Sequence, residues 1–175
     1  TREAGSLAGL DVVRILNEPT AASLAHGFGD GRRRTGMVYD LGGGTFDVSL
    51  VTLEGQGTEV LASHGNNQLG GDDFNDLLFE HLAAAFEKRH GVDLRRNHPT
   101  ARARLWWAAE AAKKQLSAEP YTRVREENLA DDNGRPLHLD IEISRDEYEW
   151  MIRPLLESTL DSVSKALDDA GKPLK

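Results

Sequence analysis

The sequence predicts a mixed α/β protein, because strand-like and helix-like patterns of apolar residues follow one another along the chain. Residues 36–50 are typical of two short strands joined by a glycine turn. Residues 71–91 and 100–116 carry apolar side chains at helical spacing, and residues 137–143 alternate apolar with polar side chains. A chain of 175 residues is long enough for one domain or for two small subdomains.

Composition narrows the class of function. A hydrophobic fraction of 39% with mixed charge indicates a globular chain, and a net charge of −8 argues against a nucleic-acid or anionic-membrane surface. No apolar run is long enough to span a bilayer, and the polar start Thr1-Arg2-Glu3-Ala4-Gly5 does not resemble a secretory signal. Cysteine is absent, which excludes disulfides and thiol chemistry. These features leave the compartment open but are compatible with a cytoplasmic protein, and we expect no nucleic-acid or membrane partner.

The first residues predict helix, strand and helix in turn. A helix is expected to end at Gly9, and Val12–Leu16 is expected to form a strand. Asn17 and Pro19 suit the start of a helix that runs to about His26, with Gly27 as its stop. Glu18 lies at the junction of the expected strand and helix, where an acid in the first helical turn is ordinary because the helix dipole favours it. The charged residues 29–35 are expected to form a solvated turn.

The glycine hairpin is the most informative stretch. Met37–Tyr39 is expected to be a short buried strand, and Phe46–Leu50 a half-buried one. Between them, glycines let an oxyanion approach the backbone, where successive N–H groups in a tight turn bind anions. Two flanking acids would repel a phosphate unless a cation such as Mg²⁺ were present. The residues concerned are Gly42, Gly43, Gly44 and the hydroxyl of Thr45, with Asp40 and Asp47 beside them. On spacing alone, a plain hairpin turn explains the glycines equally well.

Further elements follow in order. A strand is expected at residues 58–62 and a loop at 65–71, followed by a helix from 72 to Gly91 and a helix that Thr100 caps and that ends near Leu116. Residues 121–129 and 137–143 are expected to pair as strands across a turn at 131–134. Ser144 and Glu147 form a capping box before a last helix, which Pro154 must kink or split and which Gly171 and Pro173 close.

The helix at residues 100–116 carries a second group of candidate residues. At 100° per residue, Glu110, Lys113, Lys114 and Ser117 fall on the face opposite Leu105, Ala109, Ala112 and Leu116. The carboxylate of this strip can accept hydrogen bonds from ribose hydroxyls, and a lysine can pair with phosphate or lie over an adenine face. The Ser117 hydroxyl can donate to a ring nitrogen. A solvated face with a Glu–Lys pair four residues apart is the plainer interpretation. Trp106 and Trp107 are expected to pack in the core or between subdomains.

Four segments resemble the seventy-kilodalton heat-shock chaperones of the DnaK type. The hairpin Asp40-Leu-Gly-Gly-Gly-Thr-Phe-Asp47 is similar to that family's second phosphate-binding motif. The resemblance extends over nearly the whole chain in the family's order. The other three segments are Asn17–Ala22, Leu69–Phe74 with aspartate for glutamate at 72, and Glu110–Ser117.

The resemblance implies one lobe of an actin-like ATPase domain. Residues from about 1 to 70, joined by about 151–175, would form a partial ribonuclease-H-like sheet with helices, and residues 71–150 a smaller α+β subdomain. ATP or ADP with Mg²⁺ would be the ligand. The resemblance assigns the phosphates to Gly42, Gly43, Gly44, Thr45 and Gly71. It assigns adenosine to Glu110, Lys113, Lys114 and Ser117. Catalysis would fall to Asp40, Asp47 and Glu18, and the two aspartates would hold the metal through water.

The implied function is ATP hydrolysis that drives peptide binding and release in protein folding, with a nucleotide-exchange factor, a J-domain co-chaperone and unfolded client peptides as partners. The family's other phosphate loop, its catalytic lysine and its peptide-binding domain match nothing in this sequence. We therefore expect a piece of a longer protein, with weak nucleotide binding and negligible hydrolysis on its own. Two alternatives stay open: another actin-like enzyme such as a sugar kinase, or a non-enzymatic module that forms filaments or docks a partner.

Overall fold

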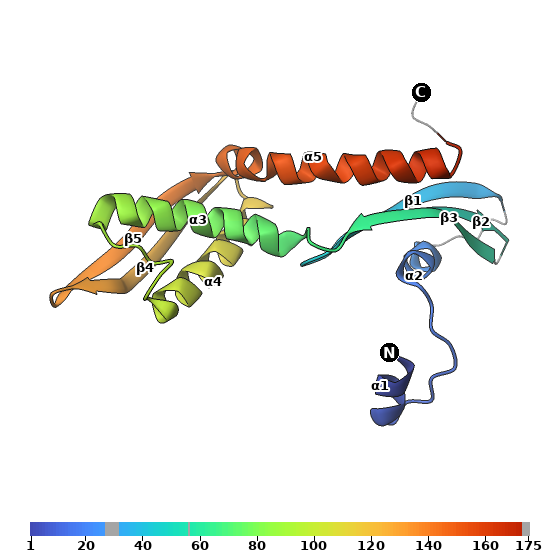
Figure 1. Ribbon diagram of the computed structural model, residues 1–175, viewed down its shortest axis with the longest axis horizontal. Helices are drawn as coiled ribbons and strands as arrows, with labels where there is room; N and C mark the ends of the chain where they lie inside the picture. Colours follow the sequence, from blue (N-terminus) through green and yellow to red (C-terminus); the bar gives the residue numbers. More distant parts are fainter. Residues whose placement is uncertain (27–31, 56, 173–175) are drawn as a thin grey trace. The chain divides into compact units, whose positions relative to one another are not determined.

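The computed structural model describes residues 1–26, 32–55 and 57–172, and their elements divide between two compact units (Figure 1). Unit 1 comprises Thr1–Leu41, Phe46–Asn66 and the chain from Thr159 onward, and unit 2 comprises Gly42–Thr45 and Asn67–Ser158. The mixed composition of helices and antiparallel sheets agrees with the predicted class. None of the helices in these ranges is long and apolar enough to cross a membrane. The elements are α1 (Arg2–Leu7), α2 (Glu18–Ala25), β1 (Arg34–Leu41), β2 (Phe46–Glu54), β3 (Gly57–Asn66), α3 (Gly71–His90), α4 (Pro99–Leu116), β4 (Tyr121–Asp132), β5 (Arg135–Ser144) and α5 (Arg145–Asp169).

Unit 1 is built on an antiparallel sheet with the order β1-β2-β3. The glycine hairpin is confirmed: Leu41 pairs with Phe46 and Asp40 with Asp47, so β1 and β2 turn at Gly42–Thr45. The prediction of a half-buried β2 is wrong, because this central strand is buried from Val48 to Leu53. β1 is not buried as predicted either, since it is an edge strand and the side chains of Met37 and Tyr39 are exposed.

The predicted strand at Val12–Leu16 is absent. Residues 10–17 have no regular secondary structure, and the side chain of Val13 is 85% exposed. A strand requires a neighbour to receive its backbone hydrogen bonds, and no described segment pairs with this one. The predicted helix before it is shorter and ends at Leu7. The predicted stop at Gly27, residues 29–31 of the charged turn and Pro173 lie outside the described residues.

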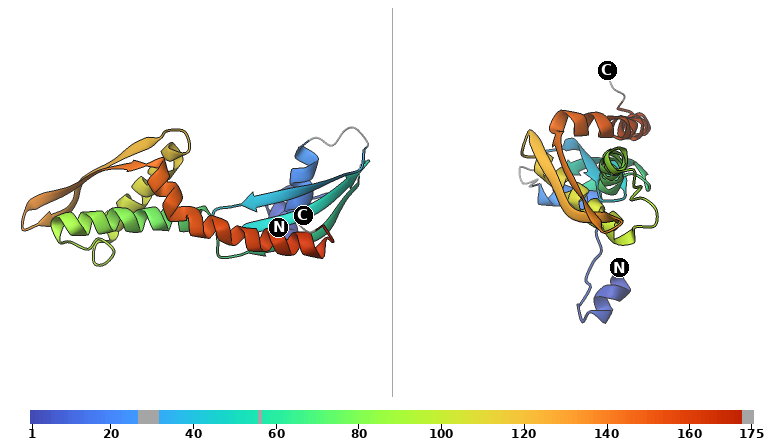
Figure 2. Two further views of the ribbon diagram at one scale, coloured as in Figure 1. Left: turned by 90° about the horizontal axis from the view of Figure 1, so that it is seen from above. Right: turned by 90° about the vertical axis from the view of Figure 1, so that its left-hand side faces the viewer.

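Unit 2 contains α3, α4, the two-stranded sheet β4–β5 and the part of α5 up to Ser158, and it has its own core. α4 packs against both α3 and β4 (Figures 1 and 2). β4 and β5 form an antiparallel hairpin that turns at Asn133 and Gly134, both with positive φ, as expected for a tight two-residue turn. Apolar residues of α3 and α4 at helical spacing are buried as predicted. They include Phe74, Leu78, Leu82 and Phe86 of α3 and Leu105, Ala109, Ala112 and Leu116 of α4.

Three helix details complete the comparison with the sequence. α4 begins at Pro99 after His98 rather than at a Thr100 cap, because proline suits the first helical position. The Ser144–Glu147 capping box is confirmed: the Ser144 N–H donates to the Glu147 carboxylate (2.9 Å), and the Glu147 N–H donates to Ser144 Oγ (3.2 Å). α5 runs unbroken through Pro154 and bends in its first third rather than splitting (Figure 2).

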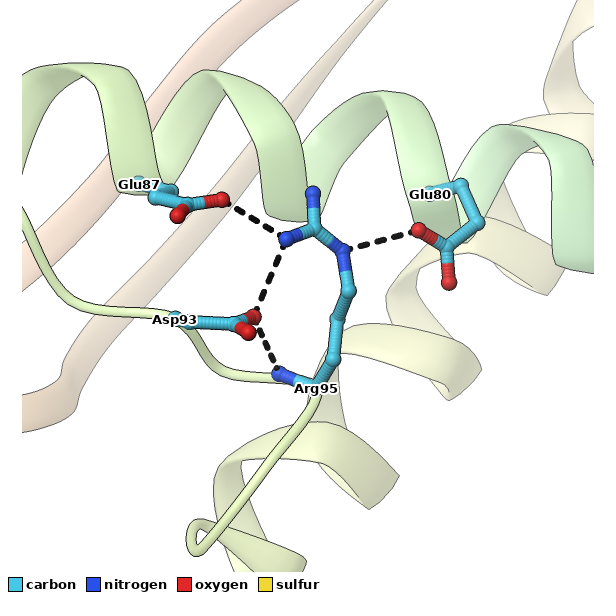
Figure 3. Close-up of polar contacts among 4 residues, drawn as sticks. All are labelled: Glu80, Glu87, Asp93 and Arg95. Atoms are coloured by element: carbon cyan, nitrogen blue, oxygen red, sulfur yellow. Dashed lines mark hydrogen bonds and ion pairs between the residues drawn. The ribbon is translucent and has the colours of Figure 1, made fainter.

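A charged cluster in unit 2 holds the α3–α4 loop against α3. The Arg95 guanidinium donates to Glu80 at 2.8 Å, to Glu87 at 2.7 Å and to Asp93 at 3.0 Å (Figure 3). We call these four residues the Arg95 cluster. These bonds lower the pKa of Asp93, for which the largest cause is the backbone N–H of Arg95, and raise the pKa of Arg95. Three carboxylates therefore surround one cation that belongs to the chain itself.

Candidate functional site

Three of the predicted residues gather in unit 1 around a small pocket. Asp40 of β1 and Asp47 of β2 are direct cross-strand partners, and Glu18 is the first residue of α2. All three line a pocket of about 120 Å³, together with Pro19, Val38, Ser49 and Ser63. That volume holds a cation with several waters, but it is too small for a nucleotide. We call Glu18, Asp40 and Asp47, with this space, the acidic pocket.

The acidic pocket is electrostatically unbalanced. Like charges placed directly across two strands repel each other, as Asp40 and Asp47 do. The pKa of Glu18 is raised by the charge of Asp40 and by a hydrogen bond with it, then by desolvation, and least by the charge of Asp47. This occurs although Glu18 is at a helix N-terminus, which favours a carboxylate. No described residue that lines the pocket is a cation.

These carboxylates are suited to an ion that keeps its waters. Among the described residues, no three carboxylates or imidazoles converge closely enough to ligate a metal directly. Hard oxygen donors around a small solvated space are the environment that Mg²⁺ takes, because it dehydrates reluctantly. The donor set therefore fits a hydrated Mg²⁺ held through water.

The glycine tip, Gly42–Thr45, belongs to unit 2. Two of its carbonyls accept hydrogen bonds from α3: the Gly42 O accepts from the Gly71 N–H at 2.9 Å, and the Gly43 O accepts from the Asp72 N–H at 2.7 Å. The Gly42 N–H donates to the Thr45 carbonyl at 2.8 Å. No hydrogen bond from the N–H of Gly43 or Gly44 to another described residue is present, and both residues are exposed. The tip therefore offers two neighbouring N–H groups to solvent.

The four predicted residues of α4 do not act alike. The Lys113 ammonium donates to the Gly71 carbonyl at 2.7 Å and so lies beside the glycine tip. Glu110 and Lys114 form an ion pair at 2.9 Å, four residues apart, as in the plainer interpretation, although the Glu110 side chain is half-buried rather than solvated. Ser117 follows the last turn and donates weakly to the Lys113 carbonyl at 3.4 Å. Ser117 also lines a larger pocket of about 460 Å³, whose other walls include Leu116, Arg145, Tyr148 and Ile152.

The tryptophans differ from expectation. Trp106 is half-buried and donates its indole N–H to Asp76 at 2.8 Å. Trp107 is 63% exposed, so its prediction as a packed residue is wrong. α4 turns its buried stripe through Leu105 and Ala109, and a residue two positions beyond Leu105 lies on the other side of a helix.

Some residues that shape the site were missed from the sequence. A Cβ at Gly65 would lie 2.4 Å from the Asp47 carboxylate, and one at Gly70 would lie 2.3 Å from the Gly43 carbonyl oxygen. Ser49 and Ser63 share a hydrogen bond at 2.9 Å at the wall of the acidic pocket. Gly65 could have been found by register, because it is the cross-strand partner of Asp47. The contact of Gly70 had no signal, since it joins segments that are distant in sequence.

Comparison with known proteins identifies the class to which this fold and these motifs belong. The family described as Hsp70 protein matches residues 1–175, so the chain belongs to the Hsp70 family. The chain is 45% identical over 172 residues to "Chaperone protein DnaK" of Anaplasma marginale, covering 98% of this chain and 26% of that protein. It is 47% identical to the Halobacterium salinarum protein of the same name (98% and 27%), and 48% identical to that of Thermotoga neapolitana (97% and 29%). It therefore spans about a quarter of these relatives' length.

Proposed function

We propose that this chain is the ATP-binding lobe of a DnaK-type chaperone with an actin-like ATPase fold, in which unit 1 contributes a partial ribonuclease-H-like sheet. In the whole protein, ATP hydrolysis drives the binding and release of unfolded client peptides. A nucleotide-exchange factor and a J-domain co-chaperone are its proposed regulators, and the cytoplasm its location. Membership of the Hsp70 family supports this function over a sugar kinase or a filament-forming module.

The observation that carries the proposal is the open backbone of the glycine tip. A phosphate oxygen accepts hydrogen bonds from successive N–H groups that have no acceptor of their own, as those of Gly43 and Gly44 have none among the described residues. A Cβ at Gly44 would meet nothing within 4 Å, so an anion has room to approach. Thr45 adds a hydroxyl donor to the proposed phosphate contacts. The N–H groups of Gly42 and Gly71 are already bonded to the Thr45 and Gly42 carbonyls, so these two glycines shape the tip rather than donate to the phosphate.

The acidic pocket is the proposed place for Mg²⁺. Asp40 and Asp47 would hold the ion through its waters, and their site would thereby supply positive charge next to a bound phosphate. The mutual repulsion that raises the pKa of Glu18 is the cost of assembling this pocket, and a cation would remove it. Glu18, Asp40 and Asp47 also supply acceptors that can orient an attacking water.

α4 is the proposed adenosine side. Glu110 would accept from ribose hydroxyls, Lys113 and Lys114 would supply positive charge, and Ser117 would donate to the base from the wall of the larger pocket. Ligand binding would compete with the Glu110–Lys114 pair, in which the Lys114 side chain is exposed and the Glu110 side chain is half-buried. Lys113 retains two further donors beyond its bond to Gly71.

The proposed reaction is phosphoryl transfer to water. The water oxygen bonds to the γ-phosphorus, the bond from that phosphorus to the β–γ bridging oxygen breaks, and the water proton is taken up by the released phosphate. Positioning and charge neutralisation provide most of the rate in such reactions. We expect negligible turnover from residues 1–175 alone, because the family's other phosphate loop and its catalytic lysine match nothing in this sequence.

Calorimetric titration with Mg-ADP tests the proposal. Wild-type chain should bind weakly but saturably, and Gly43→Asp should weaken binding by at least about tenfold, because it places a carboxylate beside a phosphate. Gly36→Asp is the control for added charge: it adds the same charge to β1, at a position where a Cβ meets nothing within 4 Å, whereas a Cβ at Gly43 lies 3.8 Å from the Asp72 carboxylate. Absence of saturable binding to the wild type, or equal binding by Gly43→Asp, would refute the proposed site.

A further inference from the structure

The glycine tip packs against the first turn of α3, and we call the hydrogen bonds that join Gly42 and Gly43 to Gly71 and Asp72 the seat of the tip. First-turn amides of a helix have no intrahelical acceptor and normally face water or a capping side chain. Here the Gly71 and Asp72 N–H groups donate instead to the carbonyls of Gly42 and Gly43, at 2.9 and 2.7 Å. Two of the donors that α3 would offer to an anion are therefore already occupied by the tip.

Gly70 makes this close approach possible. An added Cβ at Gly70 would lie 2.3, 2.4 and 2.6 Å from the Gly43 O, the Gly43 C and the Gly44 N, all of them backbone atoms that cannot swing aside. Its backbone, with φ −172° and ψ −167°, is extended and would accept any residue. Glycine is therefore needed here for space, not for conformation or for flexibility.

Lys113 fixes the other side of the same segment. Its ammonium donates to the Gly71 carbonyl at 2.7 Å, and the N–H of the same peptide unit, that of Asp72, donates to the Gly43 carbonyl of the tip at 2.7 Å. The Gly70 N–H is held by the Asp73 carboxylate at 2.7 Å. Hydrogen bonds that follow one another in this way polarise each other, so each strengthens the next.

The seat also fixes the direction in which the N–H groups of the tip point. The carbonyl and N–H of a trans peptide unit point in opposite directions, and the described chain contains no cis peptide. Because the Gly42 and Gly43 carbonyls point at α3, the N–H groups of Gly43 and Gly44 point away from it. The positive end of a 20-residue helix thus lies behind peptide units whose N–H groups face solvent.

We propose that Gly70 and Lys113 are positioning residues of the glycine tip, and that α3 acts on a bound phosphate through the tip's peptide units rather than through its own amides. The contacts between the tip and α3 are made within the chain itself, and their effect on phosphate rests on the proposed function. α4 thereby connects the adenosine side to the phosphate side through Lys113 and Gly71.

Amide hydrogen exchange of the 175-residue chain, read residue by residue by NMR, tests the seat. In the wild type, the Gly71 and Asp72 amides should exchange at least about tenfold more slowly than the open Gly43 and Gly44 amides. Gly70→Ala should abolish that protection. Gly71→Ala is the matched control and should keep it, because a Cβ there meets nothing closer than Lys113 Nζ at 3.5 Å.

A second variant covers the case in which Gly70→Ala fails to fold. Lys113→Met should speed exchange at Gly71 and Asp72 several-fold, and Lys113→Arg should restore the wild-type rate, because arginine can still donate to the Gly71 carbonyl. The amide of Leu82, deep in α3, reports whether the helix itself persists. Fast exchange at Gly71 and Asp72 in the wild type, or equal exchange in the Gly70→Ala and Gly71→Ala variants, would overturn the seat.

Mg-ADP titration of the same variants separates the two proposals. Protected Gly71 and Asp72 amides without any Mg-ADP binding would leave the seat standing and reject the nucleotide site. Weaker Mg-ADP binding by Lys113→Met, restored by Lys113→Arg, would support the positioning role. Mg-ADP binding without the protection would retain the site and reject the seat.

Discussion

The chain gathers three carboxylates twice, with opposite electrostatic results. In the Arg95 cluster, three acids share one guanidinium of the same chain, and the pKa of Asp93 is lowered. In the acidic pocket, three acids face one another with no cation among the described residues that line it, and the pKa of Glu18 is raised. The first arrangement favours the charged folded state, and the second opposes it.

The difference separates a structural group from a candidate binding group. Acids that have a cationic partner within the chain have a structural role, because their charge is already balanced and the ion pairs hold a loop in place. Acids assembled against their own repulsion require an external reason, and perturbed carboxylates in a pocket are typical of functional sites. The comparison therefore gives the acidic pocket, rather than the richer Arg95 cluster, as the place where an added cation should matter.

The largest expected effect comes from removing the internal cation. Arg95→Met keeps much of the side-chain volume but leaves the three carboxylates unbalanced, so we expect a loss of about 1 to 2 kcal/mol in the free energy of unfolding. Urea denaturation measures it. Arg123→Met is the control, because the Arg123 side chain is 54% exposed, against 28% for Arg95, and it pairs with one carboxylate, that of Asp140 on the β4–β5 hairpin, so its loss should be smaller. Equal losses from the two variants would mean that the Arg95 cluster is an ordinary surface group.

Replacing an aspartate by asparagine is expected to have a smaller effect on the unfolding midpoint, with opposite signs in the acidic pocket and the Arg95 cluster. Asp40→Asn relieves repulsion with Glu18 and Asp47 and should raise the unfolding midpoint without Mg²⁺, whereas Asp93→Asn removes a partner of Arg95 and should lower it. Millimolar Mg²⁺ should stabilise the wild type and Asp93→Asn by binding the folded state, but should have less effect on Asp40→Asn. Thermal unfolding with and without Mg²⁺ tests both statements. Shifts of the same sign would remove the distinction between the clusters.

Local signals predicted most elements, including the glycine hairpin. The glycine tip, the capping box at Ser144 and the buried stripe of α4 each depend on residues close in sequence, which is why spacing alone described them. Elements that depend on a distant partner were predicted less well. Val12–Leu16 has strand composition and no described strand to pair with, and β1 is exposed because it lies at the edge of its sheet.

The candidate site divides in the same way. The types of the acidic residues and the glycines indicated phosphate and Mg²⁺, but the bond from Lys113 to the Gly71 carbonyl crosses from α4 to α3 and has no local pattern. Helical spacing placed Lys113 with Glu110 on one strip, yet spacing cannot say what lies opposite each side chain. The steric needs of Gly65 and Gly70 likewise arise from backbones that approach only after folding.

The pH dependence of stability is the smallest expected effect and the most specific to the acidic pocket. Because the folded-state pKa of Glu18 is raised above its unfolded value near 4.5, the folded chain holds more protons than the unfolded chain as pH rises from about 4.5, and stability falls over that window. Glu18→Gln keeps a neutral hydrogen-bonding group beside Asp40, so the variant should match the wild type at pH 4 and become more stable than it as pH rises.

The same titration should act in the other direction at Asp93. Its lowered folded-state pKa contributes stability that is present above its unfolded value near 3.8 and is lost as pH falls. Unfolding midpoints of wild type, Glu18→Gln and Asp93→Asn from pH 3 to 8 measure both slopes. Mg²⁺ should flatten the slope due to Glu18 alone, since a cation in the acidic pocket favours its ionised form while the Arg95 cluster already contains its own. A difference between wild type and Glu18→Gln that stays constant with pH would show that Glu18 carries no excess repulsion.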